Sequence, residues 1–454
     1  MERSQASCFG ATRGEIETRA DVNYSRLLPL VKERLANAAY PAVPLGSKLT
    51  LVQYGSSTLA STEPSGVPIV RMNNLQQDGW ALDDLKYVTL PEKEVDSYRI
   101  ELGDILFNRT NSKELVGKCE VFREPGKWVF ASYLIRVRTN PLELDSQFAS
   151  DFLNAPTGRL QIDCVSRQIV GMTNINSEEI RDFGIPLPPL PVQQELVAAM
   201  NAARALRQRQ LAEAEALLGG FDTYLLATLG ISTPANDGRR VFGVWMADAF
   251  QKGRISPEYF HPERLLTLRA IEEAGVRHER LGDLVDFVRQ QIKTPSENYL
   301  SLGHVQSHTG ELVASSETSE GNCFTFLAGD VLFMRLRPYL NKVYLAEADG
   351  CCSPEFHVLR VRDEAAIHAD YLAVALRSKL MLLQTIHMMT GNTHPRLANE
   401  DVPDLILPVP PLAVQREVVA EVQRRRARAR QLREAADAGW AAAKAAFEAR
   451  LLGN

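Results

Sequence analysis

Residues 185–195 read IPLPPLPVQQE, and residues 407–417 read LPVPPLAVQRE. The two segments are 222 residues apart, which is close to half of the 454-residue chain. A repeat at this distance indicates an internal duplication, and it is the first feature that any fold assignment must accommodate. The positions that recur include Pro188/Pro410, Pro189/Pro411, Leu190/Leu412, Val192/Val414, Gln193/Gln415 and Glu195/Glu417.

Other segments recur in the same order in both halves. Residues 103–109 (GDILFNR) match residues 329–335 (GDVLFMR), and Leu45-Gly46 matches Leu281-Gly282. Residues 134–137 (LIRV) match residues 358–361 (VLRV), at an offset of 224 residues. The offset falls along the chain, as small loop deletions would produce. The pattern predicts two domains of similar fold.

Each predicted domain combines strands and helices. Residues 105–107 and 331–333 follow a Gly-Asp turn and are apolar, as in buried strands. Residues 145–165 and 366–389 have the pattern of helices packed on a sheet, and long polar loops are expected at 53–66 and 306–322. The predicted fold class is α+β, with two similar mixed α/β domains.

A long apolar-periodic segment follows each proline cluster and predicts a long helix. Four pairs of apolar positions keep the 222-residue offset, namely 196/418, 200/422, 214/436 and 225/447. Sustained periodicity of this kind favours an antiparallel coiled coil that acts as a rigid spacer with one domain at each end. The alternative is that each helix covers its own domain. Glycines at 219–220 and 439 predict interruptions of the helices.

Composition limits the class of protein. Apolar residues make up 45% and charged residues 24%, as in globular proteins, and the net charge of −5 gives no sign of a highly basic nucleic-acid protein. No apolar run is long enough to span a membrane, and the first residues lack the apolar core of a secretory signal. Six cysteines are too few for a disulfide framework. We expect a cytoplasmic protein without membrane contact.

Catalytic and metal-binding signatures are missing from the sequence. It contains no phosphate-binding loop, no dinucleotide fingerprint, no nucleophile elbow and no H-E-x-x-H motif. The best metal candidate is His304 and His308 with Cys323, but these histidines occupy a Ser-rich, loop-like stretch without a C-x-x-C pair. We therefore expect no catalytic residue and no metal site.

Polar and basic loops follow the paired strands and are the candidate DNA-binding elements. Arg and Lys suit phosphate oxygens and guanine edges, and Asn suits adenine. A solvated turn would explain either loop alone, whereas matching positions in two copies favour a function. The candidate residues are Asn108, Arg109, Thr110, Asn111, Lys113, Thr173, Asn174, Arg289, Gln290, Lys293, Arg335, Arg337, Tyr339, Lys342, Asn392, Thr393 and Arg396.

A basic run at Arg424–Arg430 lies on the second long helix. It could follow a phosphate backbone or face an acidic partner subunit. An ordinary solvated helix face is the simplest interpretation, because Arg is a good helix former.

The duplicated P-L-P-P-L-x-x-Q-x-E and P-V-P-P-L-x-x-Q-x-E segments, the G-D-[IV]-L-F-x-R strands and RISPEYF at 254–260 resemble the specificity subunit of type I restriction–modification systems. The resemblance implies target recognition domains at 1–186 and 233–408, and spacer helices at 187–232 and 409–454 that form an antiparallel coiled coil. Each domain would read half of a split site in double-stranded DNA.

The resemblance also implies the partners of the chain. Two methyltransferase subunits would dock on the helices and carry S-adenosylmethionine, so this chain would bind no cofactor. A motor-nuclease subunit would join for cleavage. Two other hypotheses stay open from the residues alone: a protein-interaction scaffold with the same two-lobed shape, and an enzyme with an unrecognised active site.

Overall fold

The computed structural model describes residues 22–76, 79–113, 115–169, 172–232, 242–247, 258–293, 295, 298–318, 321–391 and 393–453. Arg254 and Asn392, which belong to predicted motifs, lie outside these residues. The described chain forms two compact units. Unit 1 comprises the described part of Met1–Gln210 and Glu434–Asn454, and unit 2 comprises that of Leu211–Arg433.

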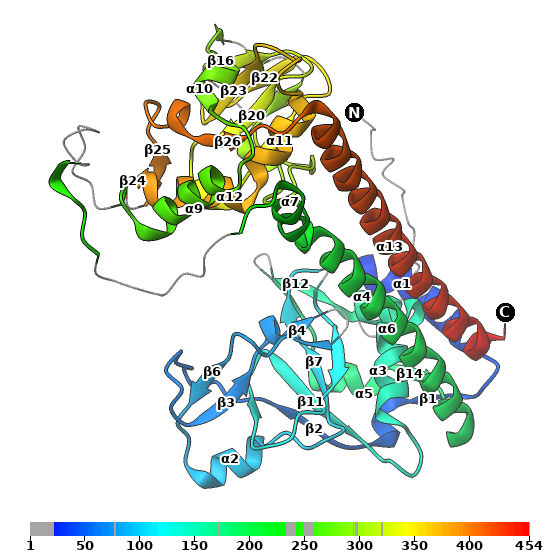
Figure 1. Cartoon of the computed structure of the whole chain (residues 1–454). Coiled ribbons are helices and arrows are strands. Elements are labelled where there is room, and N and C mark those ends of the chain that lie inside the picture. Colours follow the sequence, from blue (N-terminus) through cyan, green and yellow to red (C-terminus); the bar gives the residue numbers. More distant parts are fainter. Residues whose placement is uncertain are drawn as a thin grey trace. The chain divides into compact units, whose positions relative to one another are not determined.

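A four-stranded antiparallel sheet forms the centre of unit 1 (Figure 1). Its order is β2 (Leu49–Tyr54), β11 (Leu134–Thr139), β7 (Ile105–Asn108) and β9 (Cys119–Val121). Side chains of a strand alternate between its two faces. Ile105 and Phe107 accordingly pack with Phe148 and Phe152 of helix α3, whereas Leu106 packs in a second core on the other face. Both faces are covered, which explains the continuous apolar sequence of β7.

The other elements of unit 1 surround this sheet. Its helices are α1 (Val22–Ala36), α2 (Glu92–Tyr98), α3 (Ser146–Asn154), α4 (Pro156–Val165) and α5 (Ser177–Asp182). Small sheets are formed by β1 (Ala42–Pro44) with β14 (Gly184–Pro186), β10 (Val129–Phe130) with β3 (Val67–Val70) and β6 (Lys86–Val88), β4 (Leu75–Gln76) with β5 (Gly79–Trp80), and β12 (Arg167–Ile169) with β13 (Met172–Asn174) and β8 (Thr110–Asn111).

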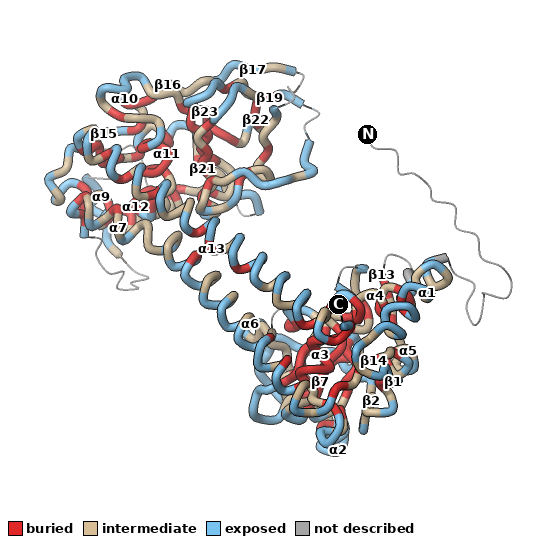
Figure 2. Tube along the Cα trace, turned by 90° about the vertical axis from the view of Figure 1, so that its right-hand side faces the viewer, coloured by how far each residue is buried: buried red, intermediate tan, exposed pale blue. Residues whose placement is uncertain are grey.

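Unit 2 repeats the central sheet of unit 1. The order is β16 (Val285–Val288), β23 (Phe356–Val361), β20 (Val331–Met334) and β21 (Val343–Leu345), again antiparallel. Val331 and Phe333 face the helices, and Leu332 and Met334 face a second core. Figure 2 shows buried residues concentrated around β23, β21 and α11. The mixed content of both units confirms the predicted α+β class.

As in unit 1, further helices and small sheets accompany the central sheet of unit 2. Besides the helices that follow the proline segments, unit 2 contains α9 (Pro262–Glu273), α10 (Leu281–Leu284), α11 (Ala369–Arg377) and α12 (Lys379–Thr385). The other strands are β15 (His278–Arg280) with β26 (Ile406–Pro408), β24 (Met389–Thr390) with β25 (Arg396–Leu397), and the sheet β17 (Gln291–Ile292), β19 (Cys323–Phe326), β22 (Gly350–Cys352) and β18 (Tyr299–Leu300).

The two predicted helices at 145–165 and 366–389 are each divided. Asp145 caps α3, because its carboxylate accepts hydrogen bonds from the amides of Gln147 and Phe148. Pro156 then begins α4, since proline suits the first turn of a helix and disfavours helical backbone in the preceding residue. In unit 2 the corresponding break falls at Ser378, which has extended backbone.

The repeated Gly-Asp pair forms a turn before β7 and β20, and its aspartate binds an arginine of the neighbouring strand, β11 or β23. Gly103 and Gly329 have φ of +93° and +90°, a conformation that favours glycine. The carboxylate of Asp104 accepts two hydrogen bonds from Arg138, at 2.6 and 2.8 Å. Asp330 does the same with Arg360, at 2.7 Å for both. Bidentate pairs of this kind are among the stronger charged contacts in proteins.

This ion pair corrects one predicted alignment. The match of residues 134–137 with 358–361 is wrong by two residues, because Arg138, not Arg136, is the counterpart of Arg360. Strand pairing agrees: Val137 lies opposite Ile105, and Leu359 lies opposite Val331. Arg136 lies farther from the Asp104 carboxylate, at 3.9 Å, and donates a hydrogen bond to the carbonyl of Ser97. The true offset in these strands is therefore 222 residues, as in the proline segments.

The repeated glutamine of the proline segment is a buried clamp. In unit 1 the amide group of Gln193 donates to the carbonyls of Glu143 and Pro188, and its oxygen accepts from the amide of Asp145. The side chain therefore ties the start of α6 (Leu190–Gly219) to the loop that precedes α3. The carbonyl of Pro188 precedes the helix and therefore receives no intrahelical hydrogen bond, and Gln193 supplies its donor.

The long helices pair antiparallel within each unit. In unit 1, Glu195 and Arg207 of α6 form ion pairs with Arg450 and Asp437 of α13 (Leu412–Leu452), at 3.6 and 3.0 Å. In unit 2, Glu213 pairs with Arg428, and the guanidinium of Arg425 lies 5.1 Å from the ring of Tyr224 in α7 (Phe221–Leu229). The apolar positions predicted to repeat at 196/418, 200/422, 214/436 and 225/447 are all buried.

Only one of the two predicted helix interruptions is present. Helix α6 ends at Gly219 and α7 begins at Phe221. The interruption predicted at Gly439 is wrong, because α13 continues through it. A glycine in a helix interior costs only about 1 kcal/mol relative to alanine, which the neighbouring Ala-rich turns can offset.

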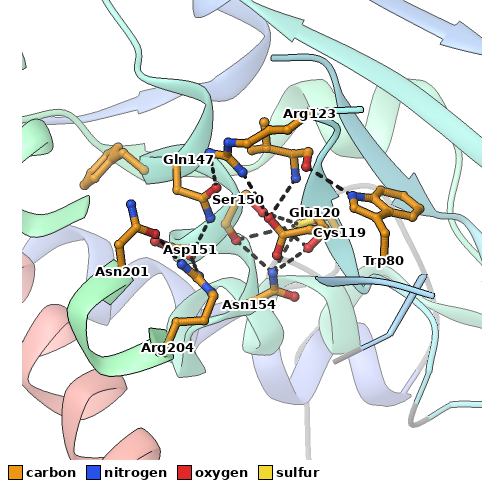
Figure 3. A network of polar contacts seen from close by, with 12 residues as sticks. Trp80, Cys119, Glu120, Arg123, Gln147, Ser150, Asp151, Asn154, Asn201 and Arg204 are labelled. Carbon is orange, nitrogen blue, oxygen red and sulfur yellow. Dashed lines mark hydrogen bonds and ion pairs between the residues drawn. The ribbon is translucent and has the colours of Figure 1, made fainter. Parts of the chain in front are cut away.

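A polar network fixes α6 on α3 in unit 1 (Figure 3). Arg204 of α6 pairs with the carboxylate of Asp151 at 2.6 Å, and Gln147 donates to the same carboxylate oxygen at 2.9 Å. The guanidinium of Arg204 also lies 5.4 Å from the ring of Trp440 in α13. Burial raises the pKa of Asp151 to about 6, although the nearby Arg204 opposes the shift.

Candidate nucleic-acid interface

The predicted binding loops leave the central sheet at equivalent points. The amide of Arg109, directly after β7, donates to the carbonyl of Tyr133, and the carbonyl of Arg109 accepts from Ile175. The amide of Arg335, directly after β20, donates to the carbonyl of Glu355, and its carbonyl accepts from Leu397. Each arginine is thus held by backbone hydrogen bonds on both sides, which places its side chain at a fixed point.

In unit 1 two predicted loops come together in one small sheet. Asn111 and Thr110 of β8 pair with Thr173 and Asn174 of β13. The hydroxyl of Thr110 donates to the side-chain oxygen of Asn174 at 2.7 Å. The segments that the sequence offered as separate loops are therefore a single platform.

Arg109 lies at the edge of this platform. Its guanidinium is 5.1 Å from the centre of the Tyr54 ring, a cation–π geometry. It also donates to the carbonyls of Ile175 and Ser132, at 3.4 and 3.5 Å. Tyr54 and the exposed Tyr133 were not among the predicted residues, although both flank Arg109.

The unit 1 candidates differ in exposure. Asn108, Thr110 and Thr173 are buried, and the amide of Asn108 donates to the carbonyl of Leu115. These side chains support the platform from within. Lys113 is exposed, whereas Asn111 and Asn174 are partly buried.

In unit 2 the corresponding platform is built on ion pairs. The guanidinium of Arg396 makes a bidentate contact with Glu355, with its closest distance at 2.7 Å. Arg335 lies 3.9 Å from the same carboxylate. Arg337 has left-handed backbone (φ 50°) and donates to the carbonyl of Thr393. One glutamate therefore organises the two arginines Arg335 and Arg396.

The other unit 2 candidates surround this group. Arg289, Gln290 and Lys293 are exposed after β16, and Tyr339 is exposed in a 3-10 turn, Pro338–Leu340. Lys342 is less available for DNA, because its ammonium donates to the carbonyl of Leu302 at 2.6 Å and burial lowers its pKa. For Asn392 no position is described.

A pocket of about 210 Å³ opens beside Arg335. Arg289, Gln291 and Asn399 line it together with the buried His357 and the rings of Phe324 and Phe356. Burial lowers the pKa of His357 to about 4, and the positive charges of Arg335 and Arg289 add to the shift. His357 is therefore neutral at physiological pH. Its Nε2 atom is buried without a hydrogen-bond partner among the described residues.

Equivalent positions carry different chemistry in the two units. The register places His357 where unit 1 has Ile135, since these residues lie opposite Phe333 and Phe107. By the backbone bonds of the two arginines, Glu355 is the counterpart of Tyr133 and Arg396 that of Asn174. Arg289, the residue after β16, is the counterpart of Tyr54. Unit 1 thus presents phenol and amide groups where unit 2 presents charged groups.

One cluster of the described residues has metal-ligand geometry. His261, Glu263 and His387 of unit 2 place ligand atoms within 4.8 Å of one another. The Nε2 atom of His387 is 2.9 Å from the Glu263 carboxylate, and the two histidine rings stack at 3.6 Å. The ring of His261 already accepts a hydrogen bond from the amide of Glu263 as a helix cap. These contacts fit a structural role in which His387 holds the start of α9 in place. That the chain binds no metal stays a prediction.

Comparison with known proteins shows similarity to specificity subunits of type I restriction enzymes. Residues 55–216 match the family model for the type I restriction modification DNA specificity domain. The chain is 27% identical over 155 residues to the type I restriction enzyme EcoKI specificity subunit of Escherichia coli strain K12, and 24% identical over 157 residues to the EcoDI specificity subunit of Escherichia coli. Each alignment covers 33% of this chain and 33% of the relative. The chain thus aligns with about a third of the length of these relatives.

The fold has a match over most of the chain. A chain from a solved structure of a type I restriction–modification system, described for complex assembly and conformational transition, aligns with 90% of this chain and 96% of its own length. The TM-score is 0.51 and the identity is 16%. No helix among the described residues is both long and apolar enough to cross a bilayer.

Proposed function

We propose that this chain is the DNA sequence-specificity subunit of a type I restriction–modification complex, and the family-model match over residues 55–216 and the similarity to known specificity subunits support the proposal. Target recognition domains at 1–186 and 233–408 each read one half of a bipartite site. The observation that carries the proposal is the pair of equivalent platforms with unlike side chains. A shared scaffold with different polar groups at the same points suits two readers of different base sequences.

The unit 2 platform suits guanine. Guanine presents two acceptors, O6 and N7, in the major groove, and an arginine can bind both. Glu355 holds Arg396 and lies near Arg335, so less side-chain entropy is lost when DNA binds. The unit 1 platform combines one arginine with amide and phenol groups, which suits a site containing adenine.

The helices at 187–232 and 409–454 set the distance between the two half-sites. In the proposal they form an antiparallel coiled coil along their length, supported by the antiparallel contacts within each unit. Their outer faces dock two methyltransferase subunits, and a motor-nuclease subunit joins for cleavage. S-adenosylmethionine and the catalytic groups belong to the partner subunits, so this chain acts as a non-catalytic cytoplasmic component.

Selection from random-sequence duplexes tests the proposal. The chain, assembled with its methyltransferase subunits, is incubated with a random library, and bound duplexes are sequenced. The expected result is enrichment of two short motifs at a fixed separation. Partner assembly without any sequence enrichment would favour a protein-interaction scaffold instead. Turnover by the isolated chain would contradict the non-catalytic assignment.

A further inference from the structure

The basic run at Arg424–Arg430 of α13 divides into outward and inward side chains. Arg424, Arg428 and Arg430 are exposed. Arg425 and Arg426 are partly buried and line a cavity of unit 2 with a volume of about 350 Å³. The run is therefore not simply a solvated face, and its inner part needs another explanation.

The cavity lies at the break between α6 and α7. It is bounded by Gly219 and Phe221 at the break, by the loop at 308–309 and by the end of α11. Arg377, the last residue of α11, and Arg433 also line it. Four arginines thus line one partly open cavity, together with the carboxylates of Asp222 and Glu215.

Two of these arginines are held in place by carbonyl groups. A guanidinium nitrogen of Arg377 donates to the carbonyl of Val343 at 3.1 Å, and one of Arg426 donates to the carbonyl of Thr309. Neither arginine has an ion pair within 4.0 Å among the described residues. Burial lowers the pKa of Arg377 to about 9, and Arg426 adds to the shift by repulsion. Burial also lowers the pKa of Arg426.

The carboxylates near the cavity are engaged elsewhere or lie at longer range. Asp222 accepts a hydrogen bond of 2.7 Å from the amide of Lys379 at the start of α12. Glu421 pairs with Arg425 and Arg424. Glu215 is exposed, and Glu311 attracts Arg377 and Arg426 only over a longer distance. Charges that are withdrawn from water are normally paired. Arg377 and Arg426 are partly buried, are held by carbonyl groups and line a cavity without an ion pair among the described residues, and these are the features of a site for an anion.

We propose that this cavity binds a phosphate group, held by Arg377 and Arg426 and flanked by Arg425 and Arg433. A tetrahedral oxyanion presents acceptors on several sides, and guanidinium groups bind phosphate in a bidentate manner. The phosphate can belong to a free anion, a nucleotide or the backbone of bound DNA. The site is separate from the base-reading platforms and does not depend on the proposed function.

Thermal unfolding of the full chain with added phosphate tests the site. Inorganic phosphate is titrated against chloride at constant ionic strength, for the wild type, Arg426→Met, Arg377→Met and the control Arg430→Met. Arg430 lies on the same helix and is exposed, so its loss removes an equal charge without touching the cavity. We expect a saturable rise in Tm for the wild type and the control, and none for the two cavity variants, because only a ligand of the folded state stabilises it.

Further probes identify the source of the phosphate. ATP without magnesium and a random-sequence duplex are tested in the same way. A larger Arg426-dependent rise with ATP indicates a nucleotide, and one with the duplex indicates the DNA backbone. Equal shifts in the wild type and the Arg426→Met variant with all three probes would overturn the proposal. An Arg426-dependent shift with the methyltransferase subunit alone would also overturn it, because the cavity would then dock a protein carboxylate.

Discussion

Gln193 and Gln415 make the same three hydrogen bonds in the two units. The amide group of Gln415 donates to the carbonyls of Ala366 and Pro410, and its oxygen accepts from the amide of His368. Gln193 makes the corresponding bonds in unit 1, and both side chains are fully buried. The duplicated proline segment is therefore a structural joint between a long helix and the sheet domain, repeated because both units need it.

Replacing either glutamine with alanine is expected to destabilise its own unit. Each change leaves a buried amide and two carbonyls without partners, at roughly 1–3 kcal/mol per orphaned group. Amide hydrogen exchange should accelerate at Asp145 in Gln193→Ala and at His368 in Gln415→Ala. The exposed Gln208→Ala serves as the control and should change neither. Unchanged exchange at both amides would show that the two glutamines do not hold the long helices on the sheet domains.

The buried carboxyl of Asp151 predicts a pH dependence of stability. Its folded pKa of about 6 lies above the ordinary value of 3.8, so the folded state binds the proton more tightly. Stability should therefore fall as pH rises from about 4 to about 6, by roughly 3 kcal/mol, and then level off. The free energy of unfolding is measured by denaturant titration at several pH values for the wild type and Asp151→Asn. The fall between pH 4 and pH 6 should be absent in the variant. The exposed Asp182→Asn should keep it.

His357 is predicted to determine the half-site read by unit 2. His357→Ile introduces the residue type that unit 1 has at the equivalent Ile135, and it removes the neutral ring beside Arg335 and Arg289. Random-duplex selection should then give an altered motif for one half-site, while the other half-site and the separation stay the same. If the wild type selects a bipartite site and the variant selects an identical one, the pocket has no part in recognition.

The length of the helices should determine the gap between half-sites. Inserting four alanines after Arg209 of α6, with a matching insertion before Glu434 of α13, keeps the helical faces approximately in register. The recognised motifs should be unchanged and their separation longer. A changed motif with an unchanged separation would contradict the role of the helices as a spacer.

The sequence predicted those parts of the fold that depend on local signals. The Gly-Asp turn before β7 and β20, the proline-led helix starts and the apolar seam all follow from residue types that act over a few positions. The register of β11 and β23 depends instead on the ion pairs Asp104–Arg138 and Asp330–Arg360, which join residues more than twenty positions apart. Matching by local similarity therefore aligned Arg136 with Arg360.

Only part of the candidate DNA-binding site could be predicted from the sequence. Arg109 and Arg335 follow recognisable strands, and their positions emerge from the repeat. Glu355 lies directly before β23 and His357 is the second residue of that strand, where the sequence suggests only core. Their role comes from neighbours contributed by other strands. An alignment at the correct offset of 222 would have set Glu355 against Tyr133 and shown the contrast between the units.

The most direct test of two separate readers compares Arg109→Ala with Arg335→Ala in the assembled methyltransferase complex. Selection from random duplexes should show that each variant loses specificity in one motif only, and in a different motif for each, at a cost of about 1–3 kcal/mol in affinity for the wild-type site. Loss of the same motif in both variants, or unchanged selection by both, would contradict the assignment of one half-site to each unit.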